Sequence, residues 1–154
     1  MRRFSYQGEQ TLPRPLEEVF PFFSNPRNLQ TITPPWLDFE ILSGEDLTMR
    51  VGLLIDYRLR VHGIPFKWQT EITAWDPPHR FVDEQRRGPY RLWIHEHTFE
   101  ARGEETLVRD RVEYGVPGGW IVQRLFVGRD VERIFAFRRE KLDMLFRRQN
   151  PSLP

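Results

Sequence analysis

His95 and His97 are the residues of this 154-residue chain whose type and spacing best suit chemistry. They are two positions apart, so in a β-strand both imidazoles point to the same face of the sheet. Histidine changes charge near neutral pH, and a carboxylate beside it can orient the ring for acid–base work or for holding a ligand. Asp110 stands in the next alternating segment and is the predicted carboxylate partner of the pair.

Alternation of apolar and polar residues predicts which other side chains share this face. Between residues 79 and 115 the outward positions are mostly charged, whereas the inward positions carry rings, β-branched residues and a few polar groups. Buried polar groups are costly without partners, so several together indicate a satisfied network or the wall of a binding pocket. The candidate ligand-binding wall comprises Tyr57, Trp68, Asp83, Gln85, Trp93, His95, His97, Asp110 and Tyr114.

Three roles for His95, His97 and Asp110 stay open at this point. The residues can form a structural network, contact a ligand, or act in catalysis with one imidazole as general base and Asp110 orienting it. Binding sites are mostly apolar with a few polar groups, which favours ligand contact over catalysis.

The sequence predicts no metal site and no cofactor. His95, His97 and Glu100 resemble a cupin metal-binding pattern, but Glu100 falls on the opposite face of its strand. The other two histidines, His62 and His79, precede the pair, so the downstream third histidine of such sites is missing. The chain has no Cys and lacks a Gly-rich phosphate loop, a nucleophile elbow and a dinucleotide-binding fingerprint.

The composition is that of a globular protein with an aromatic interior. Hydrophobic residues make up 39% and charged residues 29%, and twelve Phe, five Trp and four Tyr predict a wide core lined by rings. The net charge of +1 gives no general attraction to nucleic acid. We find no signal peptide, no apolar run that could span a bilayer and no cysteine, and we expect one cytoplasmic domain over residues 1–154.

The periodicity predicts an α+β fold. Two short helices are expected at 16–23, with Pro21 inside, and at 26–32. An apolar stripe with a 3.6-residue period, interrupted by Gly128, predicts a long C-terminal helix over 120–148. Residues 118–148 hold eight Lys or Arg against four acids, which we interpret as a solvated helix face. Seven antiparallel strands joined by short turns are predicted at 4–12, 37–41, 55–62, 66–73, 79–87, 90–101 and 105–115.

This order of elements, together with particular residues, resembles the SRPBCC superfamily, the START-like group related to polyketide cyclases and dehydrases, and in particular its small stand-alone bacterial members. The resemblance covers nearly the whole chain. It is carried by Leu16–Phe20, Asn25–Leu29, Ile32–Trp36, Gly88–Tyr90, Trp93–Phe99, Asp110–Tyr114, Pro117–Gly119 and Ile134–Arg138. It implies the helix-grip fold, a curved seven-stranded sheet wrapped around the C-terminal helix, with a deep cavity that binds lipids, polyketides or other hydrophobic metabolites.

The leading functional hypothesis is therefore non-catalytic binding or carrying of a hydrophobic small molecule between the sheet and the last helix. One alternative is an enzyme of the cyclase or dehydratase type that uses His95 or His97 as base with Asp110. Another is a regulatory or interaction module whose cavity is vestigial. The superfamily includes carriers, sensors and a few cyclases, so the fold does not choose among these functions. The sequence names no ligand and leaves both a monomer and a dimer open.

Overall fold

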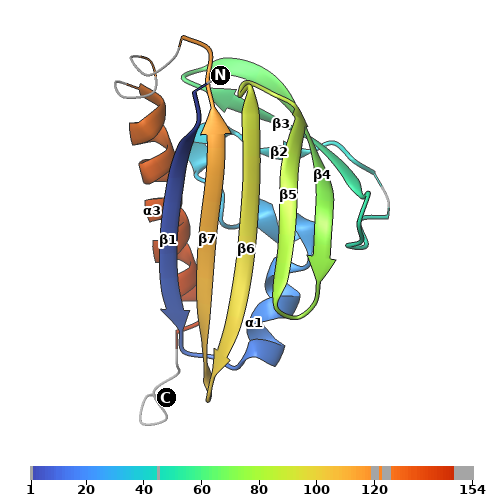
Figure 1. The fold of residues 1–154 in the computed structure, drawn as a ribbon, viewed down its shortest axis with the longest axis vertical. Coiled ribbons are helices and arrows are strands. Elements are labelled where there is room, and N and C mark those ends of the chain that lie inside the picture. Colours follow the sequence, from blue (N-terminus) through green and yellow to red (C-terminus); the bar gives the residue numbers. More distant parts are fainter. Residues whose placement is uncertain (1, 45, 119–121, 123–125, 148–154) are drawn as a thin grey trace.

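The computed structural model describes residues 2–44, 46–118, 122 and 126–147. Short helical segments follow the first strand, and a long helix follows the last one (Figure 1). The helical elements are α1 (Leu16–Phe23), η1 (Pro26–Gln30), η2 (Pro35–Leu37) and α3 (Gly128–Leu145). The strands are β1 (Phe4–Leu12), β2 (Glu40–Ile41), β3 (Leu54–Val61), β4 (Ile64–Asp76), β5 (Arg80–Arg87), β6 (Leu92–Arg102) and β7 (Glu105–Gly115).

The seven strands form one antiparallel sheet in the order β1-β7-β6-β5-β4-β3-β2, which confirms the predicted meander. The turn between β3 and β4 contains His62 and Gly63, and both have positive φ, at 50° and 78°. Two central residues with positive φ match the right-handed twist of the flanking strands, as tight hairpins require. A two-residue turn therefore connects β3 and β4 directly.

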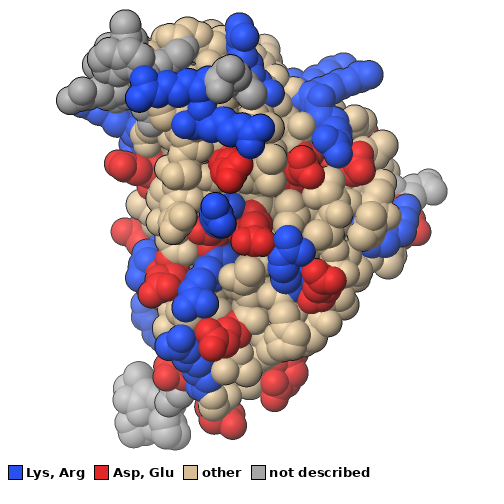
Figure 2. Space-filling model, viewed as in Figure 1, with Lys and Arg blue, Asp and Glu red and all other residues tan. Residues whose placement is uncertain are grey.

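The outer face of the sheet carries charges of both signs, as the alternation predicts. Figure 2 shows Lys and Arg side chains interspersed with Asp and Glu over β1 and β4 to β7. Several form cross-strand ion pairs, among them Arg80–Glu96 at 2.8 Å and Arg109–Glu9 at 3.2 Å. Such exposed pairs contribute little stability, but their positions identify the face of each strand that is exposed to solvent.

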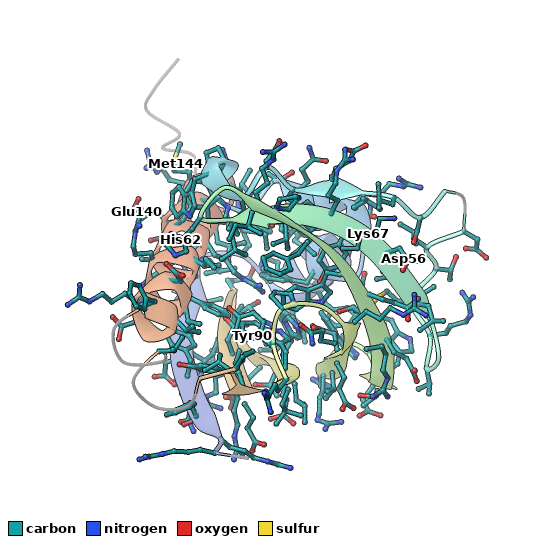
Figure 3. All side chains as sticks on the ribbon, turned by 90° about the horizontal axis from the view of Figure 1, so that it is seen from above. Asp56, His62, Lys67, Tyr90, Glu140 and Met144 are labelled. Carbon is teal, nitrogen blue, oxygen red and sulfur yellow. The ribbon has the colours of Figure 1, made fainter. Side chains whose placement is uncertain are left out.

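The inner face curves around a core of rings, and α3 closes one side of it (Figure 3). Helix α1 buries Leu16, Val19, Phe20 and Phe23 against the sheet, and the ring of Phe20 meets that of Phe99 edge-on at 5.1 Å. Helix α3 buries Val131, Phe135, Arg138 and Leu142, whose spacing of three and four residues marks one helix face. This arrangement confirms the helix-grip fold. No helix in the described part of the chain is long and apolar enough to cross a membrane.

Three local predictions differ from the structure. The second short helix is a 3₁₀ segment that ends at Gln30, and Leu37, predicted in a strand, lies in η2. Prolines cause this, because Pro35 takes the first position of η2 and Asp38 then adopts a left-handed conformation with φ of 46°. Only Glu40–Ile41 of the predicted strand pairs with β3.

The predicted helix over 120–148 also needs correction. Among the described residues α3 runs over Gly128–Leu145, and Phe126 and Val127 directly before it are π-helical, so Gly128 stands where the helix geometry changes. Residues 120, 121, 123–125 and 148 of the prediction lie outside the described residues. Leu145, predicted in the apolar stripe, is 44% exposed. Arg138, assigned by its sequence to a solvated face, is buried in the core.

We expect the packing of α3 to depend on Leu142. This side chain is 1% exposed, so Leu142→Ala leaves a cavity and should lower the free energy of unfolding by about 2–5 kcal/mol. Met144 is 63% exposed on the same helix, and Met144→Ala should change it by less than about 0.5 kcal/mol. Urea denaturation of both variants measures the difference. Equal effects would show that α3 does not pack on the core through this face.

Candidate functional site

A cavity of about 190 Å³ lies between the inner face of the sheet, the α1–η2 segment and α3. Its lining is mostly aliphatic and aromatic, and the rings of Tyr57, Trp68, Tyr90 and Trp93 form a connected group on one side. Charged or titratable groups enter the lining mainly at one wall, through Asp83, His95, His97 and Arg138. An apolar space with polar groups gathered at one place is the usual form of a small-molecule site.

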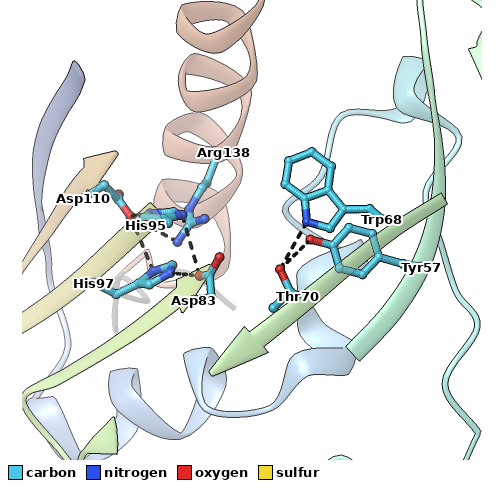
Figure 4. Close-up of polar contacts among 8 residues, drawn as sticks. All are labelled: Tyr57, Trp68, Thr70, Asp83, His95, His97, Asp110 and Arg138. Carbon is cyan, nitrogen blue, oxygen red and sulfur yellow. Dashed lines mark hydrogen bonds and ion pairs between the residues drawn. The ribbon is translucent and has the colours of Figure 1, made fainter. Parts of the chain in front are cut away.

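The polar wall is part of a five-residue unit, here called the charged cluster, which comprises Asp83, His95, His97, Asp110 and Arg138 (Figure 4). Strand β5 supplies Asp83, β6 supplies both histidines, β7 supplies Asp110 and α3 supplies Arg138. Nε2 of His95 lies 2.7 Å from Oδ1 of Asp110, and Nε2 of His97 lies 2.6 Å from Oδ2 of Asp83. Each imidazole is therefore bonded to a carboxylate from a different neighbouring strand.

Sheet register explains this pairing. His95 stands directly opposite Asp83 on β5, and His97 stands directly opposite Asp110 on β7. The short bonds nevertheless run diagonally, because the two rings stack with centroids 3.6 Å apart and point their nitrogens past one another. The longer contacts complete the arrangement, at 3.9 Å from His95 Nδ1 to Asp83 and 3.6 Å from His97 Nδ1 to Asp110.

Burial and nearby positive groups shift the pKa values of the two carboxylates in opposite directions. Burial alone would raise the pKa of Asp110, but Arg138, His95 and His97 together hold that pKa below its ordinary value. Burial would likewise raise the pKa of Asp83, and the bond from His97 and the two imidazoles outweigh it. Both carboxylates are therefore ionised at neutral pH and accept hydrogen bonds.

Burial is the main cause that lowers the pKa of His97, to about 4, and His95 beside it lowers it further against the opposing pull of Asp83. His97 is therefore neutral at pH 7. Since an ionised Asp83 only accepts, the single ring hydrogen of His97 is on Nε2. Its Nδ1 then carries a lone pair and, although buried, has no hydrogen-bond partner.

Arg138 supplies the guanidinium of the charged cluster. Its Nη2 lies 3.5 Å from Oδ1 of Asp110, and its guanidinium lies over the rings of Phe23 and Phe135 at 5.6 and 5.7 Å. Its buried Nε has no hydrogen-bond partner. A buried donor without a partner costs about 1–3 kcal/mol, so an acceptor oxygen in the cavity would be stabilised there.

A second polar group lies across the cavity, on β3 and β4. Nε1 of Trp68 donates to Oγ1 of Thr70 at 3.2 Å, and the Tyr57 hydroxyl lies 3.4 Å from the same oxygen (Figure 4). Burial raises the pKa of Tyr57, so its hydroxyl stays protonated at neutral pH.

Six of the nine predicted wall residues line the cavity: Tyr57, Trp68, Asp83, Trp93, His95 and His97. The other three do not. Asp110 lies behind the imidazoles, and Tyr114 packs with Val112 and Phe135 in a neighbouring part of the core. The side-chain amide of Gln85 bonds the backbone of Tyr90 twice, at 2.7 and 3.2 Å, and so positions a ring that does line the cavity.

Sequence reasoning missed Thr70, Tyr90 and Arg138 as lining residues. Thr70 follows the inward frame of Trp68, so alternation alone could have placed it. Arg138 falls three residues after Phe135 and four before Leu142, which is the spacing of the buried face of α3. Because Arg138 is charged, the sequence analysis assigned it to the exposed face of the helix.

A family model described as "Polyketide cyclase / dehydrase and lipid transport" matches residues 12–140. The chain belongs to this family. It is therefore a member of the SRPBCC superfamily that its sequence resembles. A search of curated proteins finds no match.

Solved structures with the same fold agree with membership of this family. Protein CV1439 from Chromobacterium violaceum has a TM-score of 0.73 at 16% identity, with 94% of this chain and 99% of that chain covered. The ZhuI aromatase/cyclase from Streptomyces sp. R1128 has a TM-score of 0.71 at 15% identity, with 92% of each chain covered. Major latex-like protein 151 from Panax ginseng has a TM-score of 0.69 at 13% identity, with 95% and 99% covered. At such identities the likeness shows the fold alone.

We expect acid to destabilise the protein through His97. Its pKa of about 4 in the fold lies below the 6.5 of an unperturbed histidine, so between these values the unfolded chain binds more protons. The free energy of unfolding should therefore fall as the pH drops from 6.5 to 4, by up to about 1.4 kcal/mol per pH unit. Below that window protonation of Asp83 and Asp110, whose pKa values are lowered, continues the loss.

Urea denaturation at a series of pH values measures this dependence. His97→Gln removes the titrating ring, so this variant should lose part of the slope between pH 6.5 and 4 and keep the decline below pH 4. The same slope in the variant as in the wild type would contradict the assignment.

Proposed function

We propose that this protein binds a hydrophobic small molecule in the cavity between the sheet and α3, with the charged cluster holding the polar end of that molecule. The observation that carries the proposal is the cavity itself, whose walls are mostly rings and aliphatic side chains. Its polar lining residues are those of the charged cluster that face it, the hydrogen-bonded group around Thr70, and Asn25 and Thr33. Apolar surface moved from water into such a space is stabilised by roughly 25 cal/mol per Å². Family membership, whose description includes lipid transport, supports the same class of ligand.

The size of the cavity limits which ligands fit. An engineered protein cavity of about 150 Å³ binds benzene, and this one measures about 190 Å³. A compound of one or two fused rings therefore fits, whereas a four-ring polyketide or a long acyl chain requires the walls to move apart. A ring compound with one hydroxyl or carbonyl oxygen matches both the apolar walls and the unpartnered donor of Arg138.

We expect 2-naphthol, a two-ring compound with one hydroxyl, to bind in the cavity, and Leu59→Trp to weaken its binding at least tenfold. Leu59 lines the cavity and is 6% exposed, so an indole at this position occupies space that the ligand needs. Leu54 on the same strand is 46% exposed and does not line the cavity, which makes Leu54→Trp the matched control.

Isothermal titration calorimetry measures both affinities, and thermal unfolding checks that each variant is folded. Wild-type affinity in a folded Leu59→Trp, or an equal loss in both variants, would place the ligand elsewhere.

A second candidate function is catalysis of the cyclase or dehydratase type. The observation that favours it is the bonding of each cavity-wall imidazole to a buried carboxylate, an arrangement that enzymes use to make a general base. Against it, Nε2 of both rings is already bonded to a carboxylate, and Nδ1 of His97 faces Asp110. Binding without chemistry is therefore our leading proposal.

His97→Gln separates binding from catalysis. If His97 only positions the ligand, this change alters one buried hydrogen bond and should weaken binding by about 1–2 kcal/mol. If His97 is a general base, binding should stay nearly intact while turnover falls about 10²–10⁴-fold. The paired measurement is affinity by calorimetry and product formation by mass spectrometry, on the compound that co-purifies with the protein. Intact binding together with lost turnover would overturn the binding proposal in favour of an enzyme.

A further inference from the structure

We propose that Asp83, His95 and His97 form a site for a divalent transition-metal ion on the wall of the cavity. Each of these residues offers one ligand atom, and the three atoms lie within 4.8 Å of one another. Metal–nitrogen and metal–oxygen bonds of about 2.0–2.2 Å hold two ligand atoms of one ion at most about 4.4 Å apart, so small side-chain rotations bring these three atoms to the spacing of a bound ion. The 2.6 Å bond between His97 Nε2 and Asp83 must open when the ion enters, and the ring hydrogen must leave Nε2.

The surroundings of the two imidazoles match those of metal-bound histidines. A histidine on a metal usually donates its other ring N–H to a carboxylate, and His95 already donates from Nε2 to Asp110 at 2.7 Å. When His97 Nε2 binds the ion, its hydrogen moves to Nδ1, which lies 3.6 Å from the same carboxylate. In this tautomer Nδ1, which is buried and has no partner in the metal-free arrangement, carries a hydrogen that faces an acceptor, and a slight shortening of the distance would form the bond. Asp110 would then orient both rings.

Charge balance also favours a cation at this place. The charged cluster holds two carboxylates and one guanidinium, that of Arg138, and imidazoles bound to a metal ion are neutral. Arg138 opposes a second cation, because it contacts Asp110 at 3.5 Å and lines the same cavity as Asp83. A divalent ion would leave one positive charge, and an anionic oxygen in the cavity, from hydroxide or from a ligand, would balance it.

The donor set limits which ion fits. Two imidazoles and one carboxylate suit zinc, iron and cobalt, whereas calcium and magnesium require mainly oxygen ligands. Three protein ligands facing a cavity leave a coordination position open, which is the form of a catalytic site and not of a structural one. The sequence predicted no metal because no third histidine follows His97, but here the third donor is a carboxylate on the neighbouring strand.

Calorimetric titration of the EDTA-treated, desalted protein with Zn²⁺ tests this site, and Co²⁺ adds a visible spectrum that reports the coordination. We expect one ion per chain, and at least tenfold weaker binding in Asp83→Asn. His62 is 60% exposed and pairs with Asp130 outside the cluster, so His62→Gln should bind as the wild type does.

Histidine-ring nitrogen NMR of the wild type locates the ion without any variant, should Asp83→Asn fail to fold. We expect Zn²⁺ to shift Nδ1 of His95 and Nε2 of His97 and to leave His62 and His79 unchanged. No binding, equal binding in a folded Asp83→Asn, or shifts only at His62 and His79 would overturn the proposal. Binding of 2-naphthol is measured in EDTA, so its failure bears on the proposed function and leaves the metal site a separate question.

Discussion

Two carboxylates buried on the inner face of the sheet impose the main constraint on this structure. An ionised carboxylate loses its water there, so Asp83 and Asp110 each need a partner from a neighbouring element. The diagonal bonds to His97 and His95 and the contact of Asp110 with Arg138 supply those partners. These contacts tie β5, β6, β7 and α3 together at one place, and the cavity lies beside it. The polar wall of the cavity is therefore also the place where the helix meets the sheet.

Most of the fold and part of this site follow from the sequence. Alternation on β5 and β6 turned Asp83, His95 and His97 to the same face, because residues two apart on a strand share a face whatever the rest of the chain does. It could not predict which carboxylate bonds which imidazole, because that depends on register and on the stacking of the rings. The burial of Arg138 was not predicted, because a basic residue in a charged helix is usually exposed. Its contacts with Asp110 and with the rings of Phe23 and Phe135 account for that burial. The strand predicted at 37–41 is shorter in the structure because of the two prolines before it.

The fold is compatible with several activities, so the shape and lining of the cavity are a better guide to function than the fold. The family description names cyclases, dehydrases and lipid transport, and similar solved structures include an aromatase/cyclase and a latex-like plant protein. In this chain a small ring-lined space ends at a charged cluster in which Nδ1 of His97 and Nε of Arg138 have no partner. We propose that such a space selects a short, mostly apolar molecule with one polar end.

Native mass spectrometry of the protein purified from its own host shows what occupies the cavity before any candidate ligand is chosen. We expect a bound apolar compound of one or two rings at one copy per chain, released on collisional activation and lost from protein whose cavity is filled by a larger side chain. Protein that is empty as isolated, and that takes up no member of a library of such compounds, would contradict this expectation.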